Sequence, residues 1–236
     1  MKNAFNIGNT WLNLNYQCNL RCEWCYASGT QFAATDDMSF DDAAKAIELT
    51  AKLGIKNVTL IGGEPTCYEQ LPQIIGLCKK NGLNVTMATN GIKLSDSSYL
   101  NELKLAGLDS IGLSLKSTNK EGYIKSTKAD AFDKVLDAIR NLVSLDMNFS
   151  VQMVLTADNI NSFIDGVTAA KNAGAKNFSF SFCYDFSQMT TSAQSTPYDF
   201  KKNMFDIIDS FVSQYDKLCK VTEDKFTLAQ TFPLCV

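Results

Sequence analysis

The chain has 236 residues, of which 45% are hydrophobic, and a net charge of −3. This length and apolar share fit one globular domain with a sizeable core. The mild acidity and the absence of a lysine- or arginine-rich run argue against a partner that is a nucleic acid or an anionic membrane. Because no segment reads as a membrane span or a signal peptide, we expect a cytoplasmic protein with reduced thiols.

Short β-type runs alternate with amphipathic segments of helical length along the chain. The predicted strands are residues 10–16, 57–62, 84–89, 110–115, 148–155 and 177–182. The predicted helices are residues 39–53, 68–81, 95–106, 129–145, 160–173 and 198–216. Ser39 has the chemistry of an N-cap for the first helix, and glycines that suit helix ends stand at positions 54, 82, 107 and 174.

This alternation predicts an α/β fold with a parallel sheet and right-handed crossovers. Six strand–helix units are too few for a closed eight-stranded barrel. We therefore expect a partial (β/α)6 TIM-like barrel that is open on one side, and a flat doubly wound sheet is the alternative. In both folds, functional groups gather at the carboxyl ends of the strands.

The unusual residues of this sequence do follow the predicted strands. A cysteine-rich loop follows the first strand, GGEPT (62–66) follows the second, Asn-Gly (90–91) follows the third and KSTNKEGY (116–123) follows the fourth. Four consecutive strands, each followed by polar or special residues, predict one site on one rim of the sheet.

Residues 18–25 read CNLRCEWC, and the chain contains no histidine. The other five cysteines are scattered, and we expect most of them to be inert. Structural zinc sites have four nitrogen or sulfur ligands, usually as two pairs, whereas a [4Fe–4S] cluster is normally bound by four thiolates. Three cysteines leave one iron without a protein ligand, which is the kind of open position that catalytic metal sites keep.

The C-x₃-C-x₂-C spacing with Trp24 before the third cysteine, followed by GGEP after the second strand, resembles the radical S-adenosylmethionine enzymes. The resemblance covers roughly residues 10–215. The segments CNLRCEWCYA, GGEPT, TNG and DAFDKVLDAIRNL look most like the subgroup that modifies peptides and proteins, whose members often carry a cysteine-rich extension called SPASM or twitch.

The resemblance implies two cofactors, a [4Fe–4S] cluster and S-adenosylmethionine. Cys18, Cys22 and Cys25 would bind three irons, and the amino and carboxylate groups of S-adenosylmethionine would chelate the fourth. One electron, from a donor of the flavodoxin or ferredoxin type, would cleave the sulfonium to methionine and a 5′-deoxyadenosyl radical, which takes a hydrogen atom from the substrate. The cofactors supply the difficult chemistry, and the protein positions the substrate.

The favoured substrate is a ribosomally made peptide or protein that is cross-linked, epimerised or similarly matured. Three alternatives stay open: a small-molecule radical enzyme of cofactor or modified-base biosynthesis, an activase that forms a glycyl radical on a partner protein, and a metal-binding module without catalysis.

The resemblance also assigns cofactor-binding roles. Gly62 and Gly63 would allow close approach to the cofactor, and Glu64, which Pro65 follows, would accept the methionine ammonium. The alternative for this segment is a plain strand-to-helix turn. Trp24 and Tyr26 would line the adenine pocket, or could equally be aromatic residues of the core.

Further cofactor contacts fall after the third to fifth strands. Thr89 and Asn90 would line the cofactor pocket, and Ser114 would contact the ribose or carboxylate. Lys116 stands where the family usually has an acid, which casts doubt on the hydrogen bonding around Ser114. Lys125 is the candidate for the usual carboxylate-binding arginine, although a lysine makes no two-pronged contact. Val154 and Leu155 would pack against the adenine, although both are equally good core residues.

The last part of the chain offers candidate substrate-binding residues and a candidate domain boundary. Cys183 and Tyr184 follow the sixth strand and are candidates to donate a hydrogen atom or touch the substrate, with strand packing as the alternative. We expect a core domain over residues 1–215 and a C-terminal extension over 216–236. Cys235, in the motif PLC, would then be the first ligand of a truncated cysteine-rich region, unless this is a short enzyme with a single cluster.

Overall fold

The computed structural model describes residues 7–25, 37–183, 204–223 and 225–228. These residues form a seven-stranded sheet whose spatial order follows the chain, and all neighbouring strands are parallel. The strands are β1 (Thr10–Asn13), β2 (Asn57–Ile61), β3 (Asn84–Thr89), β4 (Ser110–Ser114), β5 (Asn148–Leu155), β6 (Phe178–Phe182) and β7 (Phe226–Leu228).

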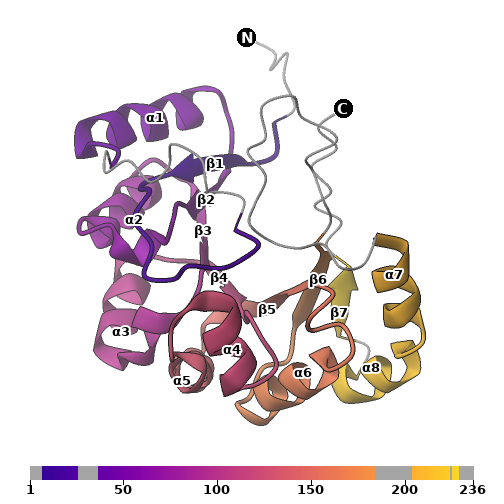
Figure 1. The fold of residues 1–236 in the computed structure, drawn as a ribbon. Coiled ribbons are helices and arrows are strands. Elements are labelled where there is room, and N and C mark those ends of the chain that lie inside the picture. The colour runs from indigo at the N-terminus through magenta and orange to yellow at the C-terminus, as the bar shows by residue number, and fades with distance from the viewer. Residues whose placement is uncertain (1–6, 26–36, 184–203, 224, 229–236) are drawn as a thin grey trace.

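The strand order selects one of the two predicted architectures. A doubly wound sheet reverses its strand order at a switch point, whereas this sheet runs from β1 to β7 without a reversal. Right-handed crossovers then put the connecting helices on one face, and the ribbon shows them around the outside of a curved sheet (Figure 1). The predicted open, partial TIM-like barrel is confirmed, but with seven strands rather than six.

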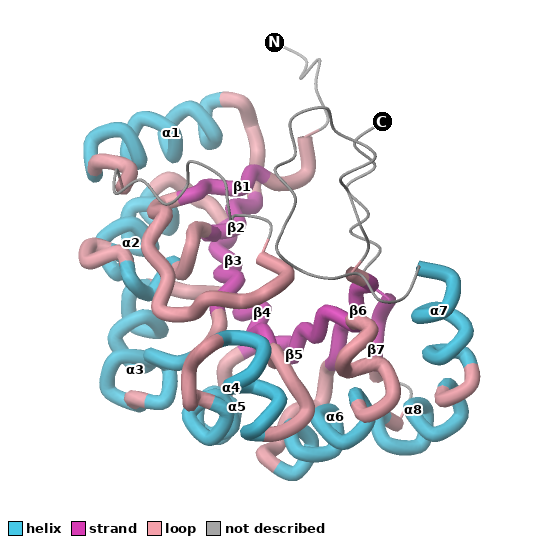
Figure 2. The backbone as a smooth tube through the Cα atoms, in the orientation of Figure 1, coloured by secondary structure: helices cyan, strands magenta, loops and turns pink. Residues whose placement is uncertain are grey.

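The α-helices of the described residues cover the outer face of this sheet and one of its ends (Figure 2). They are α1 (Phe40–Lys52), α2 (Leu71–Lys80), α3 (Ser97–Ala106), α4 (Lys120–Thr127), α5 (Phe132–Ser144), α6 (Phe163–Asn172), α7 (Met204–Val212) and α8 (Tyr215–Thr222). Among the described residues, no helix has both the length and the apolar character needed to cross a bilayer.

Period-two burial in β2 and β3 places the core on one face of these strands. Val58 and Leu60 of β2 and Val85 and Met87 of β3 are buried, while the residues between them are partly exposed or exposed. The buried set belongs to one continuous core with apolar helix residues. The other set therefore lines the inner side of the curved sheet, toward which the loops at the strand ends can reach.

Local signals at the helix ends are confirmed. Ser39 caps α1, accepting a hydrogen bond from the Asp42 backbone amide at 3.1 Å. The glycines at 54, 82, 107 and 174 all have φ between 72° and 105°, a left-handed conformation that costs glycine little.

Three predictions of secondary structure are corrected. The first strand ends at Asn13 rather than residue 16, because the chain then turns into the loop that carries the cysteines. Helix α4 was not predicted, since its eight residues are mostly polar and give no apolar period. The described part of the predicted helix 198–216 forms α7 and the start of α8.

The seventh strand was also missed, because three residues are too short to show a period. Strand β7 pairs with β6 through Phe178 and Phe226, so the sheet continues past the predicted boundary at residue 215. The assignment of residues 216–236 to a C-terminal extension stays a prediction, and Cys235 lies outside the described residues.

Candidate cofactor site

Residues 14–25, here called the cysteine loop, run across the carboxyl end of β2. The Leu14 amide donates to the Ile61 carbonyl oxygen at 3.0 Å, and the Gly63 amide donates to the Asn15 carbonyl oxygen at 2.7 Å. One step further, the Glu64 amide donates to the Gln17 carbonyl oxygen at 2.7 Å. The backbone thus joins the predicted cluster-binding loop to the GGEP segment before any cofactor is considered.

Close packing of this loop explains the two adjacent glycines. A methyl group on Gly62 would overlap the side-chain oxygen of Asn15, and one on Gly63 would overlap the carbonyl oxygens of Tyr16 and Gln17. Glycine is therefore required here for the approach of two segments of the protein itself. The contact of these glycines with S-adenosylmethionine stays a prediction.

Glu64 is a hydrogen-bond centre between the loops that follow β2 and β3. Its carboxylate is 2% exposed. The oxygen Oε1 accepts from the Thr66 amide at 3.2 Å, from Thr66 Oγ1 at 2.7 Å and from Thr89 Oγ1 at 2.5 Å, while Oε2 accepts from the Asn90 amide at 2.7 Å. Pro65 begins the 3₁₀ turn Pro65–Cys67 that aims the Thr66 amide at the carboxylate.

Three of these donors converge on Oε1 and one bonds Oε2, so protein donors engage both carboxylate oxygens. The structure thus brings together Glu64, Pro65, Thr89 and Asn90, as predicted for a common site, through contacts within the protein. The ammonium contact predicted for Glu64 stays a prediction.

Asn90 also connects the loop after β3 to the cysteine loop. Its side-chain nitrogen donates to Asn19 Oδ1 at 2.7 Å, and Asn19 directly follows Cys18. Its side-chain oxygen accepts from the Ile92 amide at 3.0 Å, which fixes the orientation of the amide group. The loops after β1, β2 and β3 therefore form one hydrogen-bonded unit.

The three cysteines of the loop are partly buried and influence one another electrostatically. The pKa of the Cys18 thiol is raised to about 11, mainly by burial. A hydrogen bond from the Leu20 amide opposes this shift, and the neighbouring Glu64, Cys22 and Cys25 add to it. Burial likewise raises the pKa of Cys22, and the nearby Lys116 ammonium counteracts it.

This donor set fits an iron–sulfur cluster. With their raised pKa, the Cys18 and Cys22 thiols keep their protons at neutral pH, and binding as thiolates would release them. Within the described residues, no three cysteine, aspartate or glutamate side chains are grouped closely enough to hold a metal ion. In a four-iron cluster, each thiolate binds a different iron, so the three sulfurs do not have to converge on one metal.

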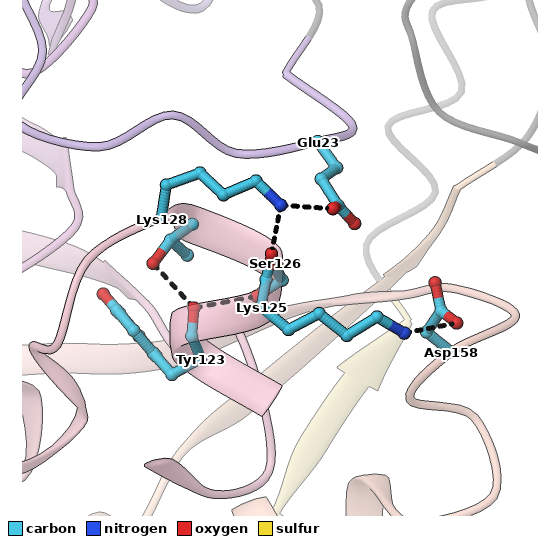
Figure 3. A network of polar contacts seen from close by, with 7 residues as sticks. Glu23, Tyr123, Lys125, Ser126, Lys128 and Asp158 are labelled. Atoms are coloured by element: carbon cyan, nitrogen blue, oxygen red, sulfur yellow. Dashed lines mark hydrogen bonds and ion pairs between the residues drawn. The ribbon is translucent and has the colours of Figure 1, made fainter. Parts of the chain in front are cut away.

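The other edge of the cysteine loop rests on the last turn of α4. The Arg21 amide donates to the Thr127 carbonyl oxygen at 2.8 Å, and the Glu23 amide donates to the Ser126 carbonyl oxygen at 3.0 Å. Lys128, just past the helix, reaches Glu23 Oε1 at 2.6 Å (Figure 3). The unpredicted helix α4 is thus one of the supports of the cluster-binding loop.

A polar cavity of about 360 Å³ lies between the cysteine loop, α4 and the segments that follow β4 and β5. Two of its lining residues, Trp24 and Lys125, were predicted to contact the cofactor. The Lys125 ammonium lies 3.4 Å from Asp158 Oδ1, across one side of the cavity (Figure 3). Thr156, whose side-chain oxygen is buried and has no hydrogen-bond partner among the described residues, also lines the cavity.

The remaining predicted cofactor residues stand close to this cavity in the sequence. Ser114, Val154 and Leu155 occupy the ends of β4 and β5, just before the lining segments that begin at Lys116 and Thr156. Ser114 and Val154 are partly buried, and Leu155 is fully buried in the core. Their contacts with adenine or ribose stay predictions, and Tyr26 lies outside the described residues.

Sequence reasoning missed several residues of the polar cavity. Lys116 was noticed only as a departure from the family pattern, yet it lines the cavity beside Cys22. Asn159 holds the loop after β5, accepting from the Thr156 amide and donating to the Val154 carbonyl oxygen, both at 2.8 Å. The signal for Asn159 was its place shortly after a strand, where asparagine commonly bonds to nearby backbone.

Cys183 lies just past β6, and its amide donates to the Leu155 carbonyl oxygen at 2.8 Å. Burial raises the pKa of this thiol to about 12, so it keeps its proton at neutral pH. A neutral thiol retains the S–H hydrogen that the predicted hydrogen-atom donor needs. Tyr184, the other candidate, lies outside the described residues.

The family model of the "Radical SAM superfamily" matches residues 12–182, which include the end of β1, the cysteine loop, the GGEP segment and β2 to β6. The chain belongs to the radical S-adenosylmethionine superfamily. Membership implies an iron–sulfur cluster and S-adenosylmethionine as its cofactors, in agreement with the donor set of the cysteine loop.

Part of the chain is similar to curated relatives. A protein of Saccharolobus islandicus (strain M.14.25) named "Probable GTP 3′,8-cyclase" is 36% identical over 146 residues, which are 59% of this chain and 46% of that relative. The chain therefore spans less than half the length of that relative.

Two solved structures share the fold. SuiB of Streptococcus suis, bound to the precursor peptide SuiA, has a TM-score of 0.74 and 17% identity over 93% of this chain and 48% of SuiB. The structure of anSMEcpe with AdoMet and the Kp18Cys peptide bound has a TM-score of 0.73 and 18% identity over 92% of this chain and 63% of that one. At these identities the likeness shows the fold alone.

Proposed function

We propose that Cys18, Cys22 and Cys25 hold a [4Fe–4S] cluster whose fourth iron binds S-adenosylmethionine. The arrangement of the three thiols on one loop, hydrogen-bonded to the GGEP segment at the strand ends, carries this proposal. When bound and reduced by one electron, the two cofactors supply a 5′-deoxyadenosyl radical that removes a hydrogen atom from the substrate. The electron donor is a flavodoxin- or ferredoxin-type protein.

The residues of the chain bind and orient these groups. The Glu64 centre keeps the loops after β2 and β3 in register with the cysteine loop, so Asn90 and Thr89 hold their positions beside it. Lys116 and the Leu20 amide favour thiolates at Cys22 and Cys18. In the polar cavity, Lys125 and Lys116 offer positive charge to a carboxylate, while Trp24 offers a flat apolar face.

We propose a ribosomally made peptide or protein as the substrate. The motifs of the cysteine loop and the GGEPT segment support this, as does a fold shared with two enzymes solved with peptides bound. A guanine nucleotide is the second candidate, favoured by the 36% identity with a relative named as a GTP cyclase. Residues 216–236, in this proposal, begin an extension that supports substrate binding.

The test starts from protein reconstituted without oxygen. The proposal expects a brown protein with about four irons per chain. It also expects formation of 5′-deoxyadenosine on addition of dithionite and S-adenosylmethionine. A colourless protein with one tightly bound zinc would instead support a binding module without catalysis.

The substrate is tested by stimulation of 5′-deoxyadenosine formation. Short peptides encoded beside the enzyme should increase the rate and gain a mass change, whereas GTP should leave it unaltered. Stimulation by GTP alone, with a cyclised nucleotide as product, would overturn the peptide proposal and leave the cofactor proposal intact.

A further inference from the structure

Tyr123, in the middle of α4, has a buried hydroxyl that no described residue satisfies. The residue is 0% exposed, and its hydroxyl oxygen has no hydrogen-bond partner among the described residues. A buried polar group without a partner costs free energy, so most such groups in folded proteins have one. The orphaned hydroxyl therefore points to a partner that binds later.

The surroundings of Tyr123 fix its position. Its carbonyl oxygen accepts hydrogen bonds from Thr127 Oγ1 at 2.7 Å and from Ser126 Oγ at 3.3 Å (Figure 3). Its ring meets the ring of Phe132 edge to face, with the centroids 6.2 Å apart. The helix and the core thus hold the ring, and the hydroxyl has little freedom to turn toward solvent.

Helix α4, which carries Tyr123, lies against the cysteine loop. The backbone of that loop is hydrogen-bonded to the carbonyl oxygens of Ser126 and Thr127, one turn beyond Tyr123. Burial raises the pKa of the Tyr123 hydroxyl, and Cys22, Glu64 and Cys18 raise it further. Tyr123 donates to neither oxygen of Glu64, whose carboxylate accepts from Thr66, Thr89 and Asn90, so the sulfur atoms are the acceptors left among these three residues.

We propose that the Tyr123 hydroxyl donates a hydrogen bond to a sulfur atom of the iron–sulfur cluster held by Cys18, Cys22 and Cys25, and so raises the reduction potential of that cluster. The inference rests on the proposed ligand set. Reduction adds negative charge to the sulfurs, and a donor nearby stabilises the reduced form. Tyr123 is thus a positioning and tuning residue of the cluster.

The test compares Tyr123→Phe with Tyr68→Phe as a matched control. Tyr68 is also buried, but its hydroxyl has a protein partner, the Met38 carbonyl oxygen at 2.9 Å. In the protein without cluster, Tyr123→Phe should melt at the same or a higher temperature than the wild type, because it removes an unpaired hydroxyl. Tyr68→Phe should melt at a lower temperature, because it removes a paired one.

After reconstitution, both variants should hold as much iron as the wild type. A redox titration followed by electron paramagnetic resonance should show a more negative midpoint for Tyr123→Phe, with a several-fold lower ratio of reduced to oxidised cluster at a fixed potential. Tyr68→Phe should match the wild type.

Two outcomes overturn the inference alone: an unchanged midpoint at full iron loading, or a lower melting temperature of the cluster-free Tyr123→Phe protein. A wild type that binds no cluster would overturn the proposed function, and this inference with it.

Discussion

The two ends of the sheet are held together by different forces. At the carboxyl ends of β1, β2 and β3, the loops are joined by hydrogen bonds that converge on Glu64 and Asn90. Beside β6 and β7, aromatic rings pack against one another in a cluster of Phe163, Phe180, Phe182, Phe211, Tyr215 and Phe226.

Hydrogen bonds are directional, whereas apolar burial is not. The hydrogen-bonded end can therefore hold cofactors in a fixed geometry, and the aromatic end mainly contributes stability. We expect substitutions at the hydrogen-bonded end to impair the site, and substitutions at the aromatic end to lower the free energy of unfolding.

The largest effect is expected from the three cysteines. Cys18→Ala, Cys22→Ala and Cys25→Ala should each lose most of the bound iron and all 5′-deoxyadenosine formation, because two thiolates leave a second iron without a protein ligand. An iron assay measures the bound iron, and chromatography measures the 5′-deoxyadenosine that is formed.

Cys67→Ala is the control for this loss, since the strongest electrostatic neighbours of Cys67 are Glu64 and Lys93 rather than the three predicted ligands. It should keep its iron. A loss of iron in Cys67→Ala would mean that four protein thiolates fill the cluster, and the open-iron account would fail.

At the other end of the sheet, Phe211→Ala should lower the free energy of unfolding by about 3–5 kcal/mol. Phe211 is buried and contacts the rings of Phe163, Phe180 and Phe182 at centroid distances of 5.5–6.2 Å. Denaturant titration of the cluster-free protein measures the loss.

Iron bound per folded chain should not change in Phe211→Ala. The neighbouring Val212 is 62% exposed, so Val212→Ala should alter stability by less than about 0.5 kcal/mol. If Phe211→Ala lost its cluster while folded, the two ends of the sheet would not be separable.

Glu64→Gln should affect both stability and the site. The amide keeps one acceptor oxygen, but its NH₂ group would face a donor such as the Asn90 amide, and we expect a loss of about 1–3 kcal/mol. Because the loops would also shift, 5′-deoxyadenosine formation per iron-loaded chain should fall on the order of tenfold. The exposed Glu48 of α1 provides the control Glu48→Gln, which should change neither.

If Glu64→Gln kept the stability of the wild type, the hydrogen-bond centre would not organise the loops. If it lost only activity, the predicted ammonium contact of Glu64 would be the better account of this residue.

Much of this molecule could be predicted from the sequence, because its signals are local. Alternating apolar residues gave six strands, and left-handed glycines gave four helix ends. The polar residues after each strand predicted the rim that carries the site. Helix α4 escaped prediction, because tertiary contacts with the cysteine loop stabilise it rather than an apolar stripe of its own.

The partners of individual side chains could not be predicted from the sequence. Glu64 was expected to face a ligand, but its carboxylate lies among protein donors from two other loops, Thr89 and Asn90 included. Tyr123 gave no signal, because its hydroxyl matters only once α4 is placed against the cysteine loop. Such pairings depend on contacts between residues about 25 to 105 positions apart, which no local pattern encodes.

The smallest effect is expected at Lys128, where α4 meets the cysteine loop. In its ion pair with Glu23, the Lys128 side chain is 55% exposed and the Glu23 side chain 29%, so Lys128→Gln should cost less than about 1 kcal/mol. That cost should vanish in 1 M salt, where the Debye length is about 3 Å. Lys128 also has a φ of 62°, which is unfavourable for any residue except glycine.

Lys128→Gly should therefore be more stable than Lys128→Ala by about 1 kcal/mol, although both remove the ion pair. Denaturant titrations of the three variants at low and high salt separate the two contributions. Equal stability of the glycine and alanine variants would show that the left-handed backbone carries no cost here. A loss for Lys128→Gln that persists in 1 M salt would show that Lys128 supports the cysteine loop by something other than its charge.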